Sequence, residues 1–240
     1  MKFALNITNW QALAPGLSDV QQWQAWSRQP WAIDPAAPLA KLSELPMMTA
    51  RRLSSGSKLA VECGLTMLRR HQPDAVLYTS RHGELERNYR IVHALATEQA
   101  LSPTDFALSV HNSSVGNLTI VAKQPIVSSS LSAGRDNFQQ GLCEVLSLLQ
   151  AGYQRVLMVD FDGFLPEFYH PQLPAEMPTW PYAVALVIEA GDDWQCETQQ
   201  AIAVNETTLP QSMLFLQHYL QNADAFSLPG ERVQWRWSRR

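Results

Sequence analysis

The clearest pattern in the chain lies between Leu108 and Gly163, which read LSVHNSSVGNLTIVAKQPIVSSSLSAGRDNFQQGLCEVLSLLQAGYQRVLMVDFDG. Its periodicity predicts a short helix, a strand, a long helix and a second strand, over residues 113–122, 126–130, 133–150 and 155–161. The second strand is almost uniformly apolar, so we expect it to be buried on both faces. The stretch therefore predicts a β-α-β unit of an α/β fold.

A serine-rich corner at residues 128–132 joins the first of these strands to the long helix. Ser132 is the expected N-cap of that helix. The first turn of a helix presents free backbone N–H groups and the positive end of the helix dipole, and both stabilise an anion. Many α/β enzymes place a nucleophile at such a corner, so it is the first candidate for a reactive position.

The rest of the chain continues the alternation of strands and helices. We expect further strands at residues 2–9, 74–80, 182–189 and 232–237, and helices at residues 18–28, 49–70, 84–99 and 210–221. This rhythm favours a parallel sheet covered by helices. The sequence predicts a single domain over residues 1–240, with a Pro- and Trp-rich arm at 9–48 and a C-terminal extension at 190–240.

Composition excludes several classes of function. The net charge is −4 and the pI is about 5.8, which gives no electrostatic footprint for nucleic acid. The three cysteines, Cys63, Cys143 and Cys196, are far apart and indicate a reducing compartment without a disulfide framework or a zinc site. The N-terminus lacks a long apolar signal segment and no run is long enough to span a membrane. We expect a cytoplasmic protein that needs no metal or cofactor.

Four motifs in sequence order resemble those of a known enzyme family. They are S-x-x-N at 109–112, G-x-L-x-I at 116–120, the glycine of the corner at Gly134, and A-G-x-x-x-V-L-x-x-D-x-D-G at 151–163. Together they resemble the N-terminal half of a β-ketoacyl synthase, a condensing enzyme of the thiolase superfamily. The resemblance covers about residues 51–189 and implies a thiolase-like half fold, with a mainly parallel, mixed sheet covered by helices.

The same resemblance implies that this chain lacks the family's nucleophile. The family's corner reads roughly T-A-C-x-S-G, and its Cys receives the acyl chain from an acyl carrier protein. With the glycine aligned on Gly134, Ser129 occupies the Thr position, Ser130 the Ala position and Leu131 the Cys position. The two partner residues, His and His or His and Asn, belong to the C-terminal half of the family's fold, for which this chain leaves no room. We therefore expect no catalytic residue and no enzyme activity.

A chain of this kind is similar to the short chain-length factors of bacterial aryl-polyene clusters. That resemblance implies a heterodimer with a catalytic ketosynthase, transient contact with acyl carrier protein, and a role in shaping the ketosynthase's acyl or polyene tunnel. The implied interface is an edge strand that pairs antiparallel with the partner, formed by Ile126, Val127, Ser128, Ser129 and Ser130. The implied tunnel wall contains His82, Phe106, Leu108, His111 and Asn112.

Three alternatives stay open at this point. A scaffold that binds carrier protein without length control would use basic residues such as Arg51, Arg52 and Arg81. The block VLMVDFDG resembles the D-x-D motif of haloacid-dehalogenase-type phosphatases, with Asp160 as nucleophile, Asp162 as acid and base, and Asp192-Asp193 as a metal-binding pair. A serine hydrolase would pair Ser130 or Ser132 with His111, although no G-x-S-x-G surrounds either serine.

Overall fold

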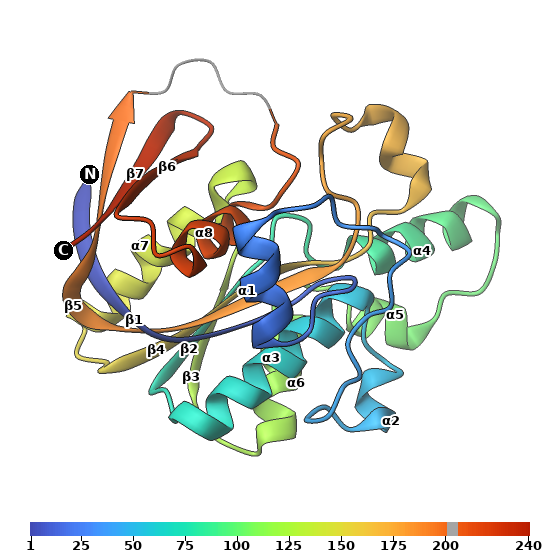
Figure 1. The fold of residues 1–240 in the computed structure, drawn as a ribbon. Helices are drawn as coiled ribbons and strands as arrows, with labels where there is room; N and C mark the ends of the chain where they lie inside the picture. The colour runs from blue at the N-terminus through green and yellow to red at the C-terminus, as the bar shows by residue number, and fades with distance from the viewer. Residues whose placement is uncertain (201–205) are drawn as a thin grey trace.

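A computed structural model of the chain describes residues 1–200 and 206–240. In that part of the chain seven strands form one sheet, and helices cover both of its faces (Figure 1). The strands are β1 (Lys2–Leu13), β2 (Ala75–Thr79), β3 (Val127–Leu131), β4 (Arg155–Asp162), β5 (Tyr182–Gln200), β6 (Ala225–Pro229) and β7 (Val233–Arg239). The helices are α1 (Val20–Arg28), α2 (Met47–Ala50), α3 (Ser55–His71), α4 (Leu85–Ala96), α5 (Pro103–Ala107), α6 (Ser113–Ala122), α7 (Asn137–Gln150) and α8 (Gln211–Leu220).

The predicted β-α-β unit is confirmed and forms the parallel part of the sheet. β2 lies between β3 and β4 and is parallel to both. β4 is buried from Val156 to Asp162, as its apolar sequence predicted. β3 pairs with β2 alone among the described strands, so it is an edge strand.

The remaining strands are antiparallel and are organised around the long strand β5. The first half of β5 lies between β4 and β1, and its second half lies between β1 and β7. β6 follows beyond β7 at the other edge of the sheet. The sheet is therefore mixed, as predicted, and its parallel part consists of β3, β2 and β4.

Two apolar layers hold the helices to the sheet. α3 and α6 cover one face, where Leu65 and Leu118 pack with Val159. α7 and α8 cover the other face, where Phe138 and Phe215 are in contact with ring centroids 5.4 Å apart. Burial of these side chains supplies the main favourable free energy of the fold.

The long helix begins later than the sequence predicted, and the N-cap at Ser132 was wrong. A 3₁₀ turn, Gly134–Asp136, comes first, and α7 begins at Asn137. The Asn137 side chain accepts a hydrogen bond from the backbone N–H of Ala133 at 3.0 Å and donates one to Asp160 at 2.8 Å. These tertiary contacts fix the start of the helix, whereas the Ser132 hydroxyl donates to the carbonyl of Arg81 at 3.4 Å.

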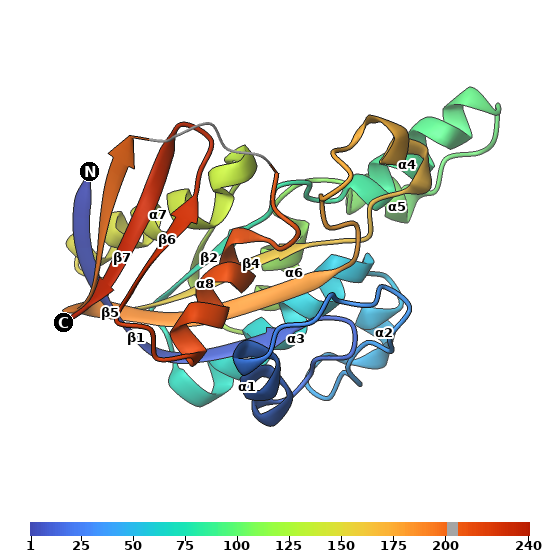
Figure 2. The same ribbon diagram turned by 45° about the horizontal axis from the view of Figure 1, so that its top comes forward.

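Residues 206–240 pack into the same core as the rest of the domain. Trp235 and Trp237 of β7 are buried beside Phe215 of α8 and Phe226 of β6. The sequence predicted α8 and β7 but missed β6. At the opposite end of the sheet, Figure 2 shows α4 and α5 extending away from the body of the domain.

Candidate functional site

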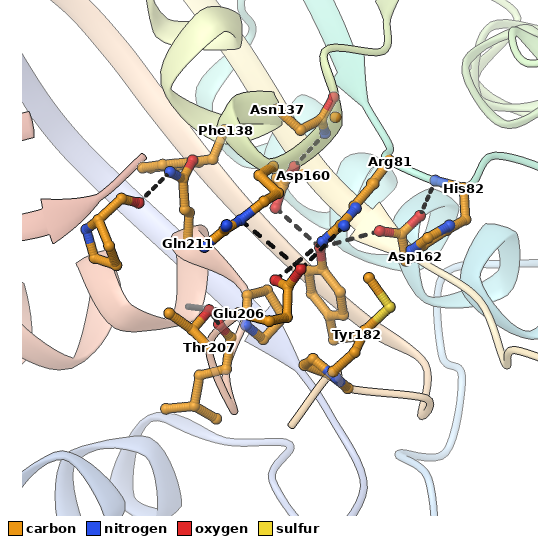
Figure 3. Close-up of a pocket in the computed structure, with 17 residues that line it drawn as sticks. Arg81, His82, Asn137, Phe138, Asp160, Asp162, Tyr182, Glu206, Thr207 and Gln211 are labelled. Carbon is orange, nitrogen blue, oxygen red and sulfur yellow. Dashed lines mark hydrogen bonds and ion pairs between the residues drawn. The ribbon is translucent and has the colours of Figure 1, made fainter. Parts of the chain in front are cut away.

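A pocket opens where the parallel strands β2 and β4 end. Arg81 and His82 follow β2, and Asp160 and Asp162 lie on the last residues of β4 (Figure 3). β5 runs antiparallel to β4, so its first residue, Tyr182, lies at the same edge of the sheet. The cavity measures about 50 Å³.

Asp160 is the centre of the polar network in this pocket. It is 2% exposed and accepts hydrogen bonds from hydroxyls of Thr79 at 2.7 Å and Ser212 at 2.6 Å. Asn137 donates to it at 2.8 Å and the Tyr182 hydroxyl at 3.2 Å. The four donors come from β2, α8, α7 and β5, so this carboxylate ties the segment after residue 206 to the parallel strands.

Asp162 holds the turn after β2 in place. Its Oδ1 atom accepts from the Ser80 hydroxyl at 2.6 Å and from the backbone N–H of His82 at 2.8 Å. The Ser80 hydroxyl also accepts from the backbone N–H of Gly83 at 2.7 Å, which closes the turn. The conformation of residues 80–83 thus depends on a buried carboxylate.

An ion pair lies beside the two aspartates in the pocket. Both terminal nitrogens of Arg81 donate to the Glu206 carboxylate at 3.1 Å, and Arg135 approaches the same carboxylate at 3.8 Å (Figure 3). The bidentate geometry is the strong form of an arginine–carboxylate contact. Arg81 is therefore engaged in an ion pair within the chain, and its contact with a carrier protein stays a prediction.

Burial shifts the titration of the groups that line the pocket. It raises the pKa of both Asp160 and Asp162 to about 6, against the hydrogen bonds that favour their charged forms. Burial, reinforced by the positive charge of Arg81, lowers the pKa of His82 to about 4. The histidine is consequently neutral at pH 7.

The corner of the predicted degenerate nucleophile adjoins this pocket. Leu131 ends β3, and its partly buried side chain packs against the core that α7 and α8 share. Gly134 has a φ of +59°, a left-handed conformation that glycine adopts without strain, and it lines the pocket. Ser129 and Ser130 precede Leu131 on the strand. The assignment of Leu131 to the nucleophile position stays a prediction.

The predicted tunnel-wall residues lie in two places. His82 lines the pocket, and His111 lies nearby because its Nε2 atom is 3.0 Å from the carbonyl oxygen of Ser80. Phe106 is instead on α5 and is 69% exposed, and Leu108 is the partly buried residue that follows that helix. Asn112 is exposed at the start of α6. The structure thus does not bring all five residues to one cavity.

The predicted interface strand is accessible. Val127 and Ser128 are exposed, whereas Ile126, Ser129 and Ser130 are partly buried. The structure begins β3 at Val127 and extends it to Leu131, one residue later than predicted at each end.

Neither catalytic alternative agrees with the geometry. The Asp160 carboxylate is committed to four donors, and Asp192 lies farther along β5, where it pairs with Arg240. Within residues 1–200 and 206–240, these aspartates form no metal-binding cluster of the phosphatase kind. His111 contacts Ser80, and no hydrogen bond joins it to Ser130 or Ser132.

The sequence did not identify Asn137, Tyr182, Glu206 and Ser212 as part of the site. Each is a common polar residue without a motif, and they come from segments far apart in the chain. Their juxtaposition follows from the β5 register and the position of α8. In residues 1–200 and 206–240, no cluster of three His, Cys, Asp or Glu residues suits a metal ion. In the same ranges, no helix is long and apolar enough to cross a membrane.

Comparison with known proteins gives three informative matches. A chain of the complex of the ketosynthase ApeO with its chain length factor ApeC from Xenorhabdus doucetiae is 58% identical, with a TM-score of 0.95, and the match covers 99% of this chain and 100% of that one. The ishigamide ketosynthase/chain length factor shares 16% identity with a TM-score of 0.65, over 82% of this chain and 68% of that one. A β-ketoacyl synthase from Burkholderia phymatum shares 14% identity with a TM-score of 0.56, and the match covers 93% of this chain and 71% of that one.

The last two matches show the fold alone. No curated protein matches the chain. The family model described as "Beta-ketoacyl synthase, N-terminal domain" matches residues 23–238. This chain therefore belongs to the β-ketoacyl synthase N-terminal domain family.

Proposed function

We propose that this chain is a non-catalytic chain-length factor that pairs with a ketosynthase in a type II pathway of the aryl polyene kind. The observation that carries the proposal is Leu131 at the end of β3, at the position to which the family's motif assigns its nucleophilic cysteine. A leucine side chain cannot form a thioester, so the condensation has to take place on the partner.

The relative from Xenorhabdus doucetiae supports this assignment. It comes from a complex of a ketosynthase with its chain length factor, and this chain covers all of it. By contrast, the chain covers only 71% of the Burkholderia phymatum β-ketoacyl synthase. Because the match with the Xenorhabdus doucetiae chain extends over the full length of both chains, we infer that this chain corresponds to the chain length factor of that complex.

The pocket also argues against catalysis within this chain. The cavity beside the corner is small, about 50 Å³, which does not favour binding of an acyl chain there. The Arg81–Glu206 ion pair and the donors around Asp160 fill the space beside the corner. These groups are engaged with one another, which favours a structural role for them over a catalytic one.

Four exposed apolar side chains lie along the segment from α5 to β3, and the proposal places the ketosynthase over them. They are Phe106, Val110, Ile120 and Val127, which are each between 47% and 72% exposed. Val127 belongs to the unpaired edge strand β3, where a second chain can add backbone hydrogen bonds. In this arrangement Phe106 and Leu108 reach the partner's tunnel, while acyl carrier protein binds only transiently.

The test is to co-express the chain with the ketosynthase encoded beside it and to measure the complex and its elongation products. We expect a one-to-one complex by size-exclusion chromatography with mass analysis. Its activity should survive Leu131→Ala and disappear when the partner's nucleophilic cysteine is replaced. Phe106→Ala should lengthen the products. Activity of this chain alone would refute the proposal, and a complex with unchanged products from Phe106→Ala would support only a scaffold.

A further inference from the structure

Phe106 is carried by a helix that has no anchor in the core. α5 has five residues, and none of them is buried. A helix of this length is not stable by itself, because nucleation costs more than a single turn returns. The Ser102 hydroxyl caps it by accepting from the Asp105 backbone N–H at 3.2 Å. The orientation of α5 must therefore come from its side-chain contacts with the rest of the domain.

Asp105, the residue before Phe106, makes those contacts with two arginines of α4. Arg90 donates from Nη2 to Oδ1 at 2.8 Å and from Nε to Oδ2 at 3.2 Å, so it holds both carboxylate oxygens. Arg87 donates from Nη1 to Oδ1 at 2.6 Å. The hydrogen bond from Arg90 lowers the pKa of Asp105, with further contributions from the charges of both arginines. The planar fork of an arginine fixes direction as well as distance.

Arg87 connects this contact to the body of the domain. It is 3% exposed, donates to the backbone carbonyl of Arg52 and contacts Glu84 at 3.2 Å. Glu84 in turn accepts from the Ser57 hydroxyl of α3. At the far end of the loop, His111 contacts the Ser80 carbonyl at 3.0 Å. The exposed residues between Asp105 and His111 are thus held at both ends.

We propose that Asp105, held by Arg87 and Arg90, is the residue that positions Phe106 against the partner ketosynthase and so sets product length. The assignment rests on the proposed function, in which Phe106 walls the tunnel. Asp105 touches no substrate and acts only through its neighbour. Arg87 is the buried member of the contact, and its removal would leave Glu84 unpaired in the interior, so it is a poor test residue. Asp105 and Arg90 are accessible to substitution, with side chains 19% and 48% exposed.

The experiment measures product length and total turnover of the co-purified complex for Asp105→Asn, Arg90→Gln and Phe106→Ala. We expect the first two variants to shift the products in the same direction as Phe106→Ala, with turnover and affinity for the ketosynthase within about twofold of the wild type. Arg90→Lys keeps the positive charge but loses the two-point contact of the guanidinium. Its product length should therefore lie between those of Arg90→Gln and the wild type. Arg69→Gln is the matched control, because Arg69 is 46% exposed in its ion pair with Glu44 and lies at the end of α3.

The double variant Asp105→Asn with Phe106→Ala separates positioning from a general loss of structure. If Asp105 acts through Phe106, the double variant gives the product length of Phe106→Ala alone. An additive shift would overturn the proposal, as would wild-type product length from both Asp105→Asn and Arg90→Gln while Phe106→Ala alters it. Wild-type length from Phe106→Ala would refute the gating function itself and this assignment with it.

Discussion

Two buried carboxyls, Asp160 and Asp162, make the stability of the chain depend on pH. Burial raises their pKa values from 3.8 to about 6 in the folded chain. Between these values the folded state binds more protons than the unfolded state, so the free energy of unfolding falls as pH rises. His82 has the opposite effect. Burial lowers its pKa from 6.5 to about 4, so between these values its contribution to the free energy of unfolding rises with pH.

Substitution separates these contributions. Asp160→Asn removes a group whose titration lowers the free energy of unfolding as pH rises from about 4 to 6. The slope of the free energy of unfolding against pH should therefore be more positive in this variant than in the wild type. His82→Asn should change the slope in the opposite direction. Urea unfolding followed by tryptophan fluorescence measures both slopes. Asp192→Asn, at an exposed ion pair with Arg240, is the control. Equal slopes for the wild type and Asp160→Asn would contradict the titration of this carboxyl in the folded chain.

At the scale of elements, β3 decides whether a second chain can extend the sheet. The Leu131 carbonyl accepts from the Ser80 N–H at 3.2 Å, so the backbone groups of Leu131 face β2. Backbone groups alternate along a strand, so those of Ser129 also face β2, whereas those of Ser128 and Ser130 face away. The free edge thus presents the N–H groups of Ser128 and Ser130 to a partner.

A proline substitution on β3 should have different effects at a residue whose N–H faces the partner and at a residue whose N–H faces β2. Ser128→Pro removes an outward N–H, so the chain should keep its melting temperature to within a few degrees while its ketosynthase complex weakens about tenfold. Ser129→Pro removes an inward donor and should lower the melting temperature of the chain itself. Thermal unfolding of the isolated chain and titration with the ketosynthase measure both. Unchanged affinity for Ser128→Pro would mean that β3 does not pair with the partner.

Elements with local patterns could be predicted from the sequence, and elements defined by distant contacts could not. α6 was predicted at its observed bounds, because its small and apolar residues repeat with a helical period. β6 was missed, because Ala225–Pro229 is short and contains a proline that only an edge strand tolerates. The second half of β5 was also missed, since its pairing with β1 and β7 joins the two ends of the chain.

The same distinction applies to the site. The corner at Leu131 and Gly134 lay within one continuous motif and was predicted, whereas Ser212 reaches Asp160 only through the packing of α8. The motif around Asp160 left a phosphatase-like nucleophile open as an alternative, and the four donors that converge on this carboxylate from other segments do not favour it. A sequence motif does not contain those donors.

For the whole molecule, the exposed apolar side chains of Phe106, Val110, Ile120 and Val127 affect how the chain behaves alone. Exposed apolar side chains favour association, and a partner that covers them stabilises the folded chain by mass action. Ile120 is 72% exposed, so lysine fits there without disturbing the core. In the complex, however, the ammonium group would lose its water against an apolar surface.

We therefore expect Ile120→Lys to keep the isolated chain in solution at higher concentration and to weaken its complex with the ketosynthase by about tenfold or more, which corresponds to about 1.4 kcal/mol. Val20→Lys is the matched control, because Val20 is 54% exposed and lies on α1, outside the segment from Phe106 to Val127. Light scattering of the isolated chain and a binding titration measure the two effects. If both lysine variants bind like the wild type, the ketosynthase does not cover Ile120, and the binding face has to be sought on another side of the domain.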